Sequence, residues 1–527
     1  VKNVTLLNAY RGIGLNVPPF ERSNHELSRV ENVKGTVLYR GLEARNSSDV
    51  GNWRNIHFSN RYWADAPTAY NPPPRATLDS WTRANGTAFT FADVEWDNFY
   101  RLSAEDYHVG IHFVDGARIA FAGQFYDVAI ADSTVAIKAD PDSIDSRRPH
   151  WGASFWRSAL EGSVAAVENN SAGHIHLANS SVAGAFGGKY AERVRSTATA
   201  SPAAEPYMEI ASPPKPTRSV LYDVTRAPYH APSTLGRIPA HDATGAIQSA
   251  LNEAGEAGGG VVYLPAGWYR ISSGLSVPAN VELRGSSAVM NRSHPGLSNG
   301  TVLFAYREGA DNPALITLDG ANAGVRGLRV FYPGNRYARA NSFKYYPYAL
   351  RINGVADAWI VNVAIENGFR GVIAEPGSDG HYIRDVVGAT THGFIRIGAS
   401  KSGWIENCHS NINFWPRNGY RVGEWMVEGR DVFWGDFLAT RKRNDYLIQI
   451  ENALDERLLN NFSYGGKHGI QALNSKVQAV NTGTDNVGGH TVVAGEGAVV
   501  RVVNSMRYNG SSNTAGAAES HNEMNLD

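Results

Sequence analysis

Residues 349–415 read ALRINGVADAWIVNVAIENGFRG (349–371), VIAEPGSDGHYIRDVVGATTHG (372–393) and FIRIGASKSGWIENCHSNINFW (394–415). Each segment contains an aromatic residue, an isoleucine, any residue and then Asn or Asp, which puts Asn362, Asp385 and Asn407 in register. Self-similarity at about 23 residues is typical of repeat proteins in which each repeat is one structural unit. Apolar residues alternate over short runs and Gly-rich turns follow, so each segment is predicted to be one coil of short strands.

The same pattern recurs on both sides of this stretch. It continues in LLNNF, VQAVN and VRVVN, and the first half repeats it; the corresponding residues are Asn461, Asn481 and Asn504, and Asn8, Asn32 and Asn55. Stacked coils pair each strand with the strand one coil above, about 4.8 Å away, and superimpose equivalent side chains in ladders. The sequence therefore predicts an all-β chain made of two tandem right-handed parallel β-helices.

The predicted boundaries follow from composition. Residues 198–219 are rich in Pro, Ala and Ser and are predicted to be a linker. This gives a first β-helix over 1–197, a second over 220–510 and a polar tail over 511–527. The second β-helix opens with a helix capped by Asp242. The first has no such start, so we expect an N-terminal segment to be missing from it.

Charge and cysteine content exclude several classes of protein. Lys plus Arg (49) and Asp plus Glu (50) nearly cancel, so nucleic acid and anionic membranes are not expected partners. One cysteine, Cys408, allows neither an intramolecular disulfide nor a Cys-based zinc site, and no metal ion or cofactor is expected. No apolar run approaches the length of a membrane span, and we expect a secreted protein whose export signal has been removed.

Two segments carry a family resemblance. DATGAIQSALNEAGEAGGGVVYLPAGWYRI (242–271) and VPANVELRGSS (277–287) resemble the opening of the pectin-lyase-like β-helix superfamily. Two such β-helices joined by a Pro-rich connector resemble glycoside hydrolase family 55, a family of exo-acting β-1,3-glucanases. The resemblance implies a secreted enzyme that cuts a polysaccharide, with a β-1,3-linked glucan as the substrate.

The resemblance also implies where the catalytic groups lie. Residues 419–453 resemble the catalytic stretch of that family, and its upstream carboxylate corresponds to Glu424 or Glu428. The family's general-acid Glu is not matched. Residues 441–445 (RKRND) stand in its place, so this acid is either absent or displaced onto Asp445.

Coil spacing offers further carboxylates. Glycoside hydrolysis needs two carboxyl groups, about 5 Å apart for retention and 6.5 to 9.5 Å for inversion. Asp385 occupies a position that is Asn in neighbouring coils, with Glu406 about one coil later and Glu428 about two. On a shared face, Asp385 and Glu428 are expected roughly 9 to 10 Å apart, near the inverting range.

Aromatic residues gather in the same region, where the coil repeat is interrupted. Pyranose rings pack on aromatic faces, and loops that leave a rigid scaffold commonly carry sites. The residues predicted to bind substrate are Tyr348, Trp415, Tyr420, Trp425, Trp434, Tyr446, Arg441 and Lys442. We expect the catalytic centre around residues 385–446, facing the first domain across a cleft.

Two other functions remain open. A lyase acting on a uronic-acid polymer needs cations to neutralise the substrate carboxylate, and the basic residues 441–443 are candidates. A catalytically inactive glycan-binding or adhesin β-helix would use the aromatic residues without an acid and base.

Overall fold

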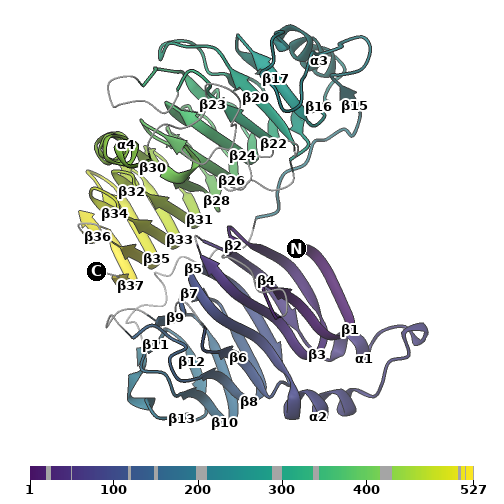
Figure 1. Cartoon of the computed structure of the whole chain (residues 1–527), viewed down its shortest axis with the longest axis vertical. Coiled ribbons are helices and arrows are strands. Elements are labelled where there is room, and N and C mark those ends of the chain that lie inside the picture. The colour runs from purple at the N-terminus through teal and green to yellow at the C-terminus, as the bar shows by residue number, and fades with distance from the viewer. Residues whose placement is uncertain are drawn as a thin grey trace. The chain divides into compact units, whose positions relative to one another are not determined.

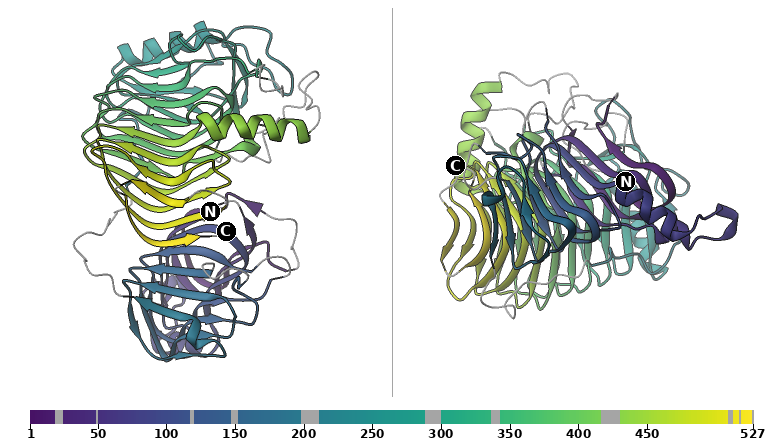
Figure 2. Two further views of the ribbon diagram at one scale, coloured as in Figure 1. Left: turned by 90° about the vertical axis from the view of Figure 1, so that its left-hand side faces the viewer. Right: turned by 90° about the horizontal axis from the view of Figure 1, so that it is seen from below.

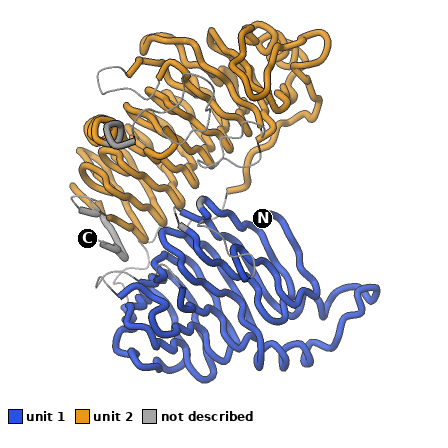
Figure 3. Tube along the Cα trace, in the orientation of Figure 1, with its two compact units in different colours: residues 1–205, 521–527 blue, residues 206–520 orange. Residues whose placement is uncertain are grey.

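The computed structural model describes residues 1–18, 25–48, 50–116, 120–146, 152–197, 211–287, 300–335, 343–415, 430–508, 512–516 and 518–525. The chain divides into two compact units (Figure 3). Unit 1 comprises Val1–Glu205 with His521–Asp527, and unit 2 comprises Pro206–Ser520.

Unit 1 is a stack of parallel strands (Figure 1). The strands are β1 (Lys2–Leu15), β2 (His25–Glu26), β3 (Arg29–Ser48), β4 (Asn52–Phe58), β5 (Thr87–Glu105), β6 (Val109–Phe113), β7 (Ala122–Tyr126), β8 (Ala129–Ala139), β9 (Gly152–Trp156), β10 (Ala159–Asn169), β11 (His174–Ala178), β12 (Ser181–Ala183), β13 (Phe186–Gly187) and β14 (Val194–Thr197). The helices are α1 (Arg61–Ala64) and α2 (Arg75–Asn85). One path of hydrogen-bonded neighbours runs β5-β7-β9-β11 and another β6-β8-β10-β12, so the chain alternates between two faces as it coils. The predicted parallel β-helix is confirmed for this half.

Aromatic rings stack inside unit 1. Phe99, Phe125 and Phe155 occupy equivalent positions on β5, β7 and β9. Successive ring centroids lie 4.3 Å apart, and the rings are nearly parallel. One coil spacing therefore sets both the strand pairing and the aromatic packing of the core.

An asparagine ladder follows one bend of unit 1, but with a different first member from the predicted one. Asn3, Asn32 and Asn55 all have left-handed backbone angles, and the Asn32 and Asn55 amides each donate to the amide oxygen of the residue one coil earlier, at 3.0 and 2.8 Å. The prediction that Asn8 belongs to this ladder is wrong. The first coil is longer than the predicted period, and the register between β1 and β3 shifts near Ala9.

Unit 2 is a second stack of parallel strands, whose coils are seen edge-on in Figure 2. Its strands are β15 (Leu221–Asp223), β16 (Gly260–Leu264), β17 (Gly267–Ile271), β18 (Leu275–Val277), β19 (Val281–Gly285), β20 (Thr301–Ala305), β21 (Ile316–Leu318), β22 (Gly324–Phe331), β23 (Tyr348–Ile352), β24 (Trp359–Gly368), β25 (Arg370–Ala374), β26 (His381–Thr390), β27 (Ile395–Ile397), β28 (Gly403–Glu406), β29 (His409–Asn411), β30 (Tyr446–Glu451), β31 (Glu456–Tyr464), β32 (His468–Leu473), β33 (Lys476–Asp485), β34 (His490–Ala494), β35 (Val499–Tyr508) and β36 (Ser512–Gly516), while β37 (Glu519–Asn525) crosses the boundary between the units. The helices are α3 (Thr244–Glu256) and α4 (Arg430–Asn444).

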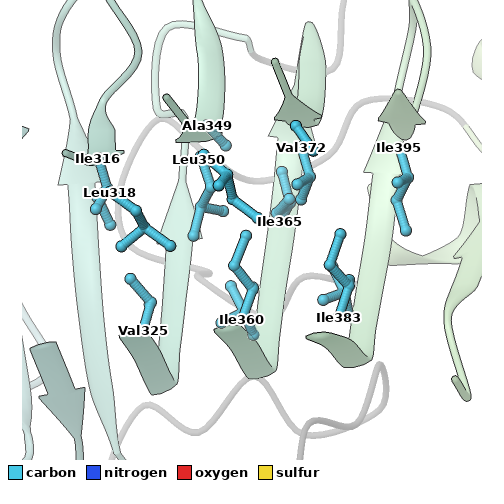
Figure 4. Packing of buried hydrophobic residues seen from close by; sticks show 14 of the residues in the cluster. Ile316, Leu318, Val325, Ala349, Leu350, Ile360, Ile365, Val372, Ile383 and Ile395 are labelled. Atoms are coloured by element: carbon cyan, nitrogen blue, oxygen red, sulfur yellow. The ribbon is translucent and has the colours of Figure 1, made fainter. Parts of the chain in front are cut away.

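Two long sheets of unit 2 enclose an aliphatic core. One sheet runs β16-β19-β22-β24-β26-β28-β31-β33-β35, and the other runs β18-β21-β23-β25-β27-β30-β32-β34-β36. Ile360 and Ile383 from the first sheet face Val372 and Ile395 from the second (Figure 4). The predicted parallel β-helix is thus also confirmed for this half.

Both ends of unit 2 extend the coil pattern. Ile247 and Leu251 of α3 are fully buried in the core cluster, so this helix covers the first coils. Asp242 accepts hydrogen bonds from Thr244 and Ser272, which fixes the start of that helix beside β17. At the other end β36 pairs with β34, so strand pairing continues into the region predicted to be a tail.

The ladder of unit 2 contains Asn362, Asp385 and Asn407, all with left-handed backbone angles. Further along, the amide of Asn481 donates to Asn460 at 2.8 Å, so Asn460 takes the place that the sequence pattern gave to Asn461. The adjacent pair of asparagines allowed a one-residue error, because both fit the local pattern. Only register distinguishes them.

Candidate functional site

Strand alternation brings the predicted carboxylates of two coils together. Ile383 and Ile405 pair across β26 and β28 and point into the core of unit 2. The next residues along each strand, Arg384 and Glu406, are also paired and therefore point to the outer face of the sheet. Asp385 follows directly at the left-handed bend.

Two donors contact both carboxylates. Arg384 Nε lies 3.5 Å from Asp385 Oδ2 and 3.8 Å from Glu406 Oε1. Asn407 Nδ2 lies 3.2 Å from Asp385 Oδ1 and 3.5 Å from Glu406 Oε1. The Trp404 indole donates to Glu406 Oε2 at 3.0 Å. Asp385 and Glu406 are therefore immediate neighbours, and fixed partners set their orientation.

This cluster is buried. Asp385 is 2% exposed, Arg384 is 2% exposed and Glu406 is not exposed. Two carboxylates share one guanidinium, and buried charges are stable only when they are paired or hydrogen-bonded in this way. Cys408, also fully buried, lies just beyond, with its sulfur 3.5 Å from the Glu406 carbonyl oxygen.

Asp445 has a different environment. Its carboxylate accepts hydrogen bonds from Arg441 at 2.6 Å, Thr390 at 2.8 Å, the Gly393 backbone at 2.9 Å and Ser410 at 3.4 Å. Burial raises the pKa of the Asp445 carboxyl, and the Arg441 charge and these hydrogen bonds oppose that effect. The carboxylate therefore fastens the end of α4 to the coils of β26 and β29.

The predicted binding cations already have partners within the protein. Arg441 is fully buried and donates to Ser410 at 2.7 Å as well as to Asp445. Lys442 donates to the Asn486 side chain at 2.7 Å. Trp415 is also buried, with its ring 4.5 Å from that of Phe437 on α4.

Two predicted tyrosines lie partly exposed on the other sheet. Tyr348 has the Arg370 guanidinium 5.4 Å from its ring, and Tyr446 has the Lys467 ammonium 5.4 Å from its ring. Tyr446 also stacks on His468. Rings with adjacent cations and open edges suit the faces and hydroxyls of a sugar.

Two histidines on or beside this sheet pack against neighbouring rings. His468 stacks on His490 at 5.7 Å, and His392 lies 4.4 Å from the Phe369 ring. Burial, with the nearby charge of Lys467, lowers the pKa of His468 to about 4. Burial also lowers the pKa of His392 to about 4, with a contribution from Arg370. Both imidazoles are therefore neutral near pH 7.

Five predicted residues are not placed. Tyr420, Glu424, Trp425 and Glu428 lie outside the described residues, as does the side chain of Trp434. The expected separation of Asp385 and Glu428 accordingly stays a prediction.

Sequence reasoning missed the partners of the carboxylates. Arg384, Trp404 and Asn407 each stand within two residues of a predicted acid, so strand alternation could have identified them. The fully buried pair of His381 and Glu456, 2.9 Å apart, lacks any such local signal. Its members are two coils apart and meet across Gly403.

Comparison with known proteins agrees with this architecture. Residues 239–387 match the family described as "Rhamnogalacturonase A/epimerase, pectate lyase-like". The matched segment lies within unit 2 and runs from before α3 into β26. No curated protein matches the chain significantly.

Solved structures similar to the chain include an enzyme and a phage protein. DFA-IIIase from Arthrobacter chlorophenolicus A6 in complex with GF2 aligns at 13% identity and a TM-score of 0.37, over 55% of this chain and 70% of that one. The Acinetobacter phage vb_AbaP_AS12 gp42 tailspike aligns at 12% identity and a TM-score of 0.39, over 55% of this chain and 46% of the tailspike.

A further similar structure is a "1,3-alpha-1,4-beta-D-galactose-4-sulfate-3,6-anhydro-D-galactose-2-sulfate 4 galactohydrolase", at 16% identity and a TM-score of 0.35, over 56% of this chain and 75% of that one. At these identities and TM-scores the likeness carries no information on the chemistry of this chain.

Among the described residues, no group of three or more His, Cys, Asp or Glu side chains is arranged to hold a metal ion. Within the same part of the chain, no helix has the length and apolar character required to span a membrane.

Proposed function

We propose that the chain is a glycoside hydrolase that cuts a polysaccharide with carboxyl groups of unit 2. The main support is the adjacency of Asp385 and Glu406. Glycosidase carboxyl groups stand roughly 5 to 9.5 Å apart, and the shared contacts with Asn407 keep these two no farther apart than that range allows. Trp404 and Asn407 hydrogen-bond the carboxylates, as a preorganised site requires, and the Arg384 charge lies beside both.

The proposed chemistry is a displacement at the anomeric carbon. One carboxylic acid gives its proton to the glycosidic oxygen as the bond from that oxygen to the anomeric carbon breaks. In the inverting course, a carboxylate takes a proton from the water that attacks the same carbon. Asp385 and Glu406 are the described candidates, and Glu424 or Glu428 is the candidate from family resemblance.

The proposal also covers the substrate and the cellular location of the enzyme. A β-1,3-linked glucan is the proposed substrate, on the basis of the resemblance of residues 419–453. Of the predicted binding aromatics that the structure describes, Tyr348 and Tyr446 are partly exposed and could pack on sugar residues, whereas Trp415 is buried. Because polysaccharides are too large to enter a cell freely, the enzyme is proposed to be secreted.

Burial has a consequence for access. Asp385 and Glu406 are buried in the structure, so contact with a substrate requires a change that exposes them. Asp445 is not proposed to take part in the chemistry, because four donors already occupy its carboxylate.

The first test is an activity panel. The full chain is incubated with a β-1,3-glucan, other neutral polysaccharides and polygalacturonate, and the products are sized. New reducing ends from a neutral polymer support the hydrolase. Unsaturated uronate products from polygalacturonate alone would replace it with the lyase, and binding without cleavage of any polymer would replace it with an adhesin.

The second test assigns the acids on whichever polymer is cut. Removing a general acid or base lowers the rate by about 10² to 10⁴-fold. We therefore expect such a loss for Asp385→Asn or Glu406→Gln, and for one of Glu424→Gln and Glu428→Gln. Glu375→Gln is the matched control, because this partly exposed acid pairs with Arg351 one coil away. Near-normal turnover in both Asp385→Asn and Glu406→Gln would contradict the assignment.

A further inference from the structure

Three aromatic rings of unit 1 meet outside its core. Tyr10 on β1 stacks on Tyr39 of β3, with centroids 5.2 Å apart and planes within 13°. The Trp81 ring of α2 packs edge-on against Tyr10 at 6.2 Å. Tyr10 is 57% exposed and Trp81 is 37% exposed. We call these three residues the aromatic patch.

The patch does not fill the core. The residue before Tyr10, Ala9, packs against the core of unit 1, whereas more than half of Tyr10 is exposed. On α2 the buried residues are Leu78 and Thr82, and Trp81 lies off that side of the helix. Large exposed rings that contact one another are a recognised mark of binding surfaces.

Guanidinium groups border the patch. Arg11 and Arg40 are paired across β1 and β3, and both lie near the Tyr39 ring, at 5.6 and 5.3 Å from its centroid. Glu43 contacts Arg40 at 3.4 Å but also Arg45 at 2.9 Å. Arg11 is exposed. Arg40 and Arg45 thus share the single carboxylate of Glu43. Arg11 adds a further positive charge beside the Tyr39 ring.

We propose that the aromatic patch is a binding site for an acidic polysaccharide, separate from the candidate acids of unit 2. The exposed faces of Tyr10 and Trp81 pack against sugar rings, while Arg11 and Arg40 bind carboxylate or sulfate groups of the same chain. Aromatic rings alone would suit a neutral glycan equally well. The bordering guanidiniums are what select an anionic one.

This site goes beyond the proposed function and does not depend on it. It would hold the protein on an anionic polysaccharide, which is a different polymer from the neutral glucan proposed as the substrate of unit 2. Its test is therefore retention of the full chain, measured apart from cleavage.

The experiment is affinity electrophoresis of the full chain in gels containing polygalacturonate, a sulfated galactan or neutral dextran. Carboxylate and sulfate are distinguished by the first two polymers. Retention by at least one of them, weakened by added salt, is expected, with less retention by dextran. Equal retention by all three polymers, or no retention by any, would overturn the proposal.

Variants locate the site. Stacking rings contribute enough that Tyr10→Ala and Trp81→Ala should each weaken binding by roughly threefold to tenfold. Arg11→Gln should weaken binding and reduce its dependence on salt. Tyr70→Ala is the control, because Tyr70 is a comparably exposed aromatic residue of unit 1, at 54%, outside the patch. Unchanged retention of a Tyr10→Ala, Trp81→Ala double variant, or an equal loss in the control, would contradict the assignment.

Turnover of a short oligosaccharide distinguishes a failure of the binding-site proposal from a failure of the proposed glycoside hydrolase activity. The patch variants should leave that turnover unchanged, because the patch residues belong to unit 1 and none of them is a candidate catalytic residue. If the wild-type chain cleaves nothing, the electrophoresis still decides whether the patch binds. A patch variant that loses short-substrate turnover along with retention would show that the rings serve the catalytic site instead.

Discussion

Short polar residues with left-handed backbone angles at the bends contribute both to the fold and to the candidate site. Asn362, Asp385 and Asn407 adopt this conformation on successive coils, and short polar side chains tolerate it better than others. Asn407 donates to Asp385 along the ladder, and an amide oxygen at 385 could accept the same bond. Asp385→Asn thus removes the charge while it keeps the bend, which makes the activity test interpretable.

Asp445 provides a contrasting prediction. Asp445→Asn leaves the fully buried Arg441 guanidinium without its counter-ion, and breaking a buried pair typically costs about 3 to 5 kcal/mol. We expect a clear fall in the midpoint of urea unfolding. Asp455→Asn breaks the exposed pair with Arg457 and should cost at most about 1 kcal/mol. Equal midpoints for the two variants would contradict the anchoring role.

The pair of His381 and Glu456 predicts a dependence of stability on pH. Burial opposes protonation of His381, but the Glu456 carboxylate outweighs it and raises the pKa above the usual value. With the folded pKa raised, the stabilisation is fully present below about pH 6.5, the pKa of a free histidine, and it is lost as pH rises through the folded pKa. The difference in unfolding midpoint between wild type and His381→Gln should therefore be largest in mild acid and shrink in alkali.

His392 supplies the control of opposite sign. Its pKa is lowered to about 4, so the folded state disfavours its charge. Compared with His392→Gln, the wild type should lose stability as pH falls below about 6.5. A difference for His381→Gln that grows with pH would rule out the ion pair.

At the scale of strands, the absence of a side chain at Gly403 leaves room for the pair of His381 and Glu456. Gly403 lies between His381 and Glu456 in register, and a Cβ there would overlap both side chains. Gly403→Ala should therefore destabilise at least as much as His381→Gln. Gly435→Ala, on an exposed turn of α4 with no atom near the new Cβ, should be neutral or stabilising by up to about 1 kcal/mol. Thermal unfolding of the two variants compares them directly, and equal melting temperatures would refute the packing argument.

The strands also show how far sequence patterns reach. Period and alternation predicted the coils around Asn362, Asp385 and Asn407, because each coil repeats the same local motif. They failed at Asn8 and Asn461, where a longer coil and a doubled asparagine hide the register. Contacts between coils, such as that of Arg384 with Glu406, depend on the register between strands and on which face of the sheet each side chain occupies. The sequence therefore predicted the region of the candidate site but only some of the residues that contact one another in it.

For the whole molecule, the spread of acids over coils predicts metal-independent activity. Among the described residues, acidic and imidazole groups are paired with cations or with each other across coils instead of converging on one point. Activity on the true substrate should survive prolonged incubation with a chelator. Loss of activity that calcium restores would contradict this and favour a calcium-dependent lyase.

The thiol of Cys408 offers a way to measure how often the coil around the candidate acids opens. Cys408 is the single cysteine of the chain, and it is sealed in the same coil as Glu406. A thiol-specific reagent can modify it only when that coil opens, so the labelling rate counts openings at the candidate acids without any engineered probe. The same measurement with sugar present would show whether ligand occupancy and coil opening compete or go together.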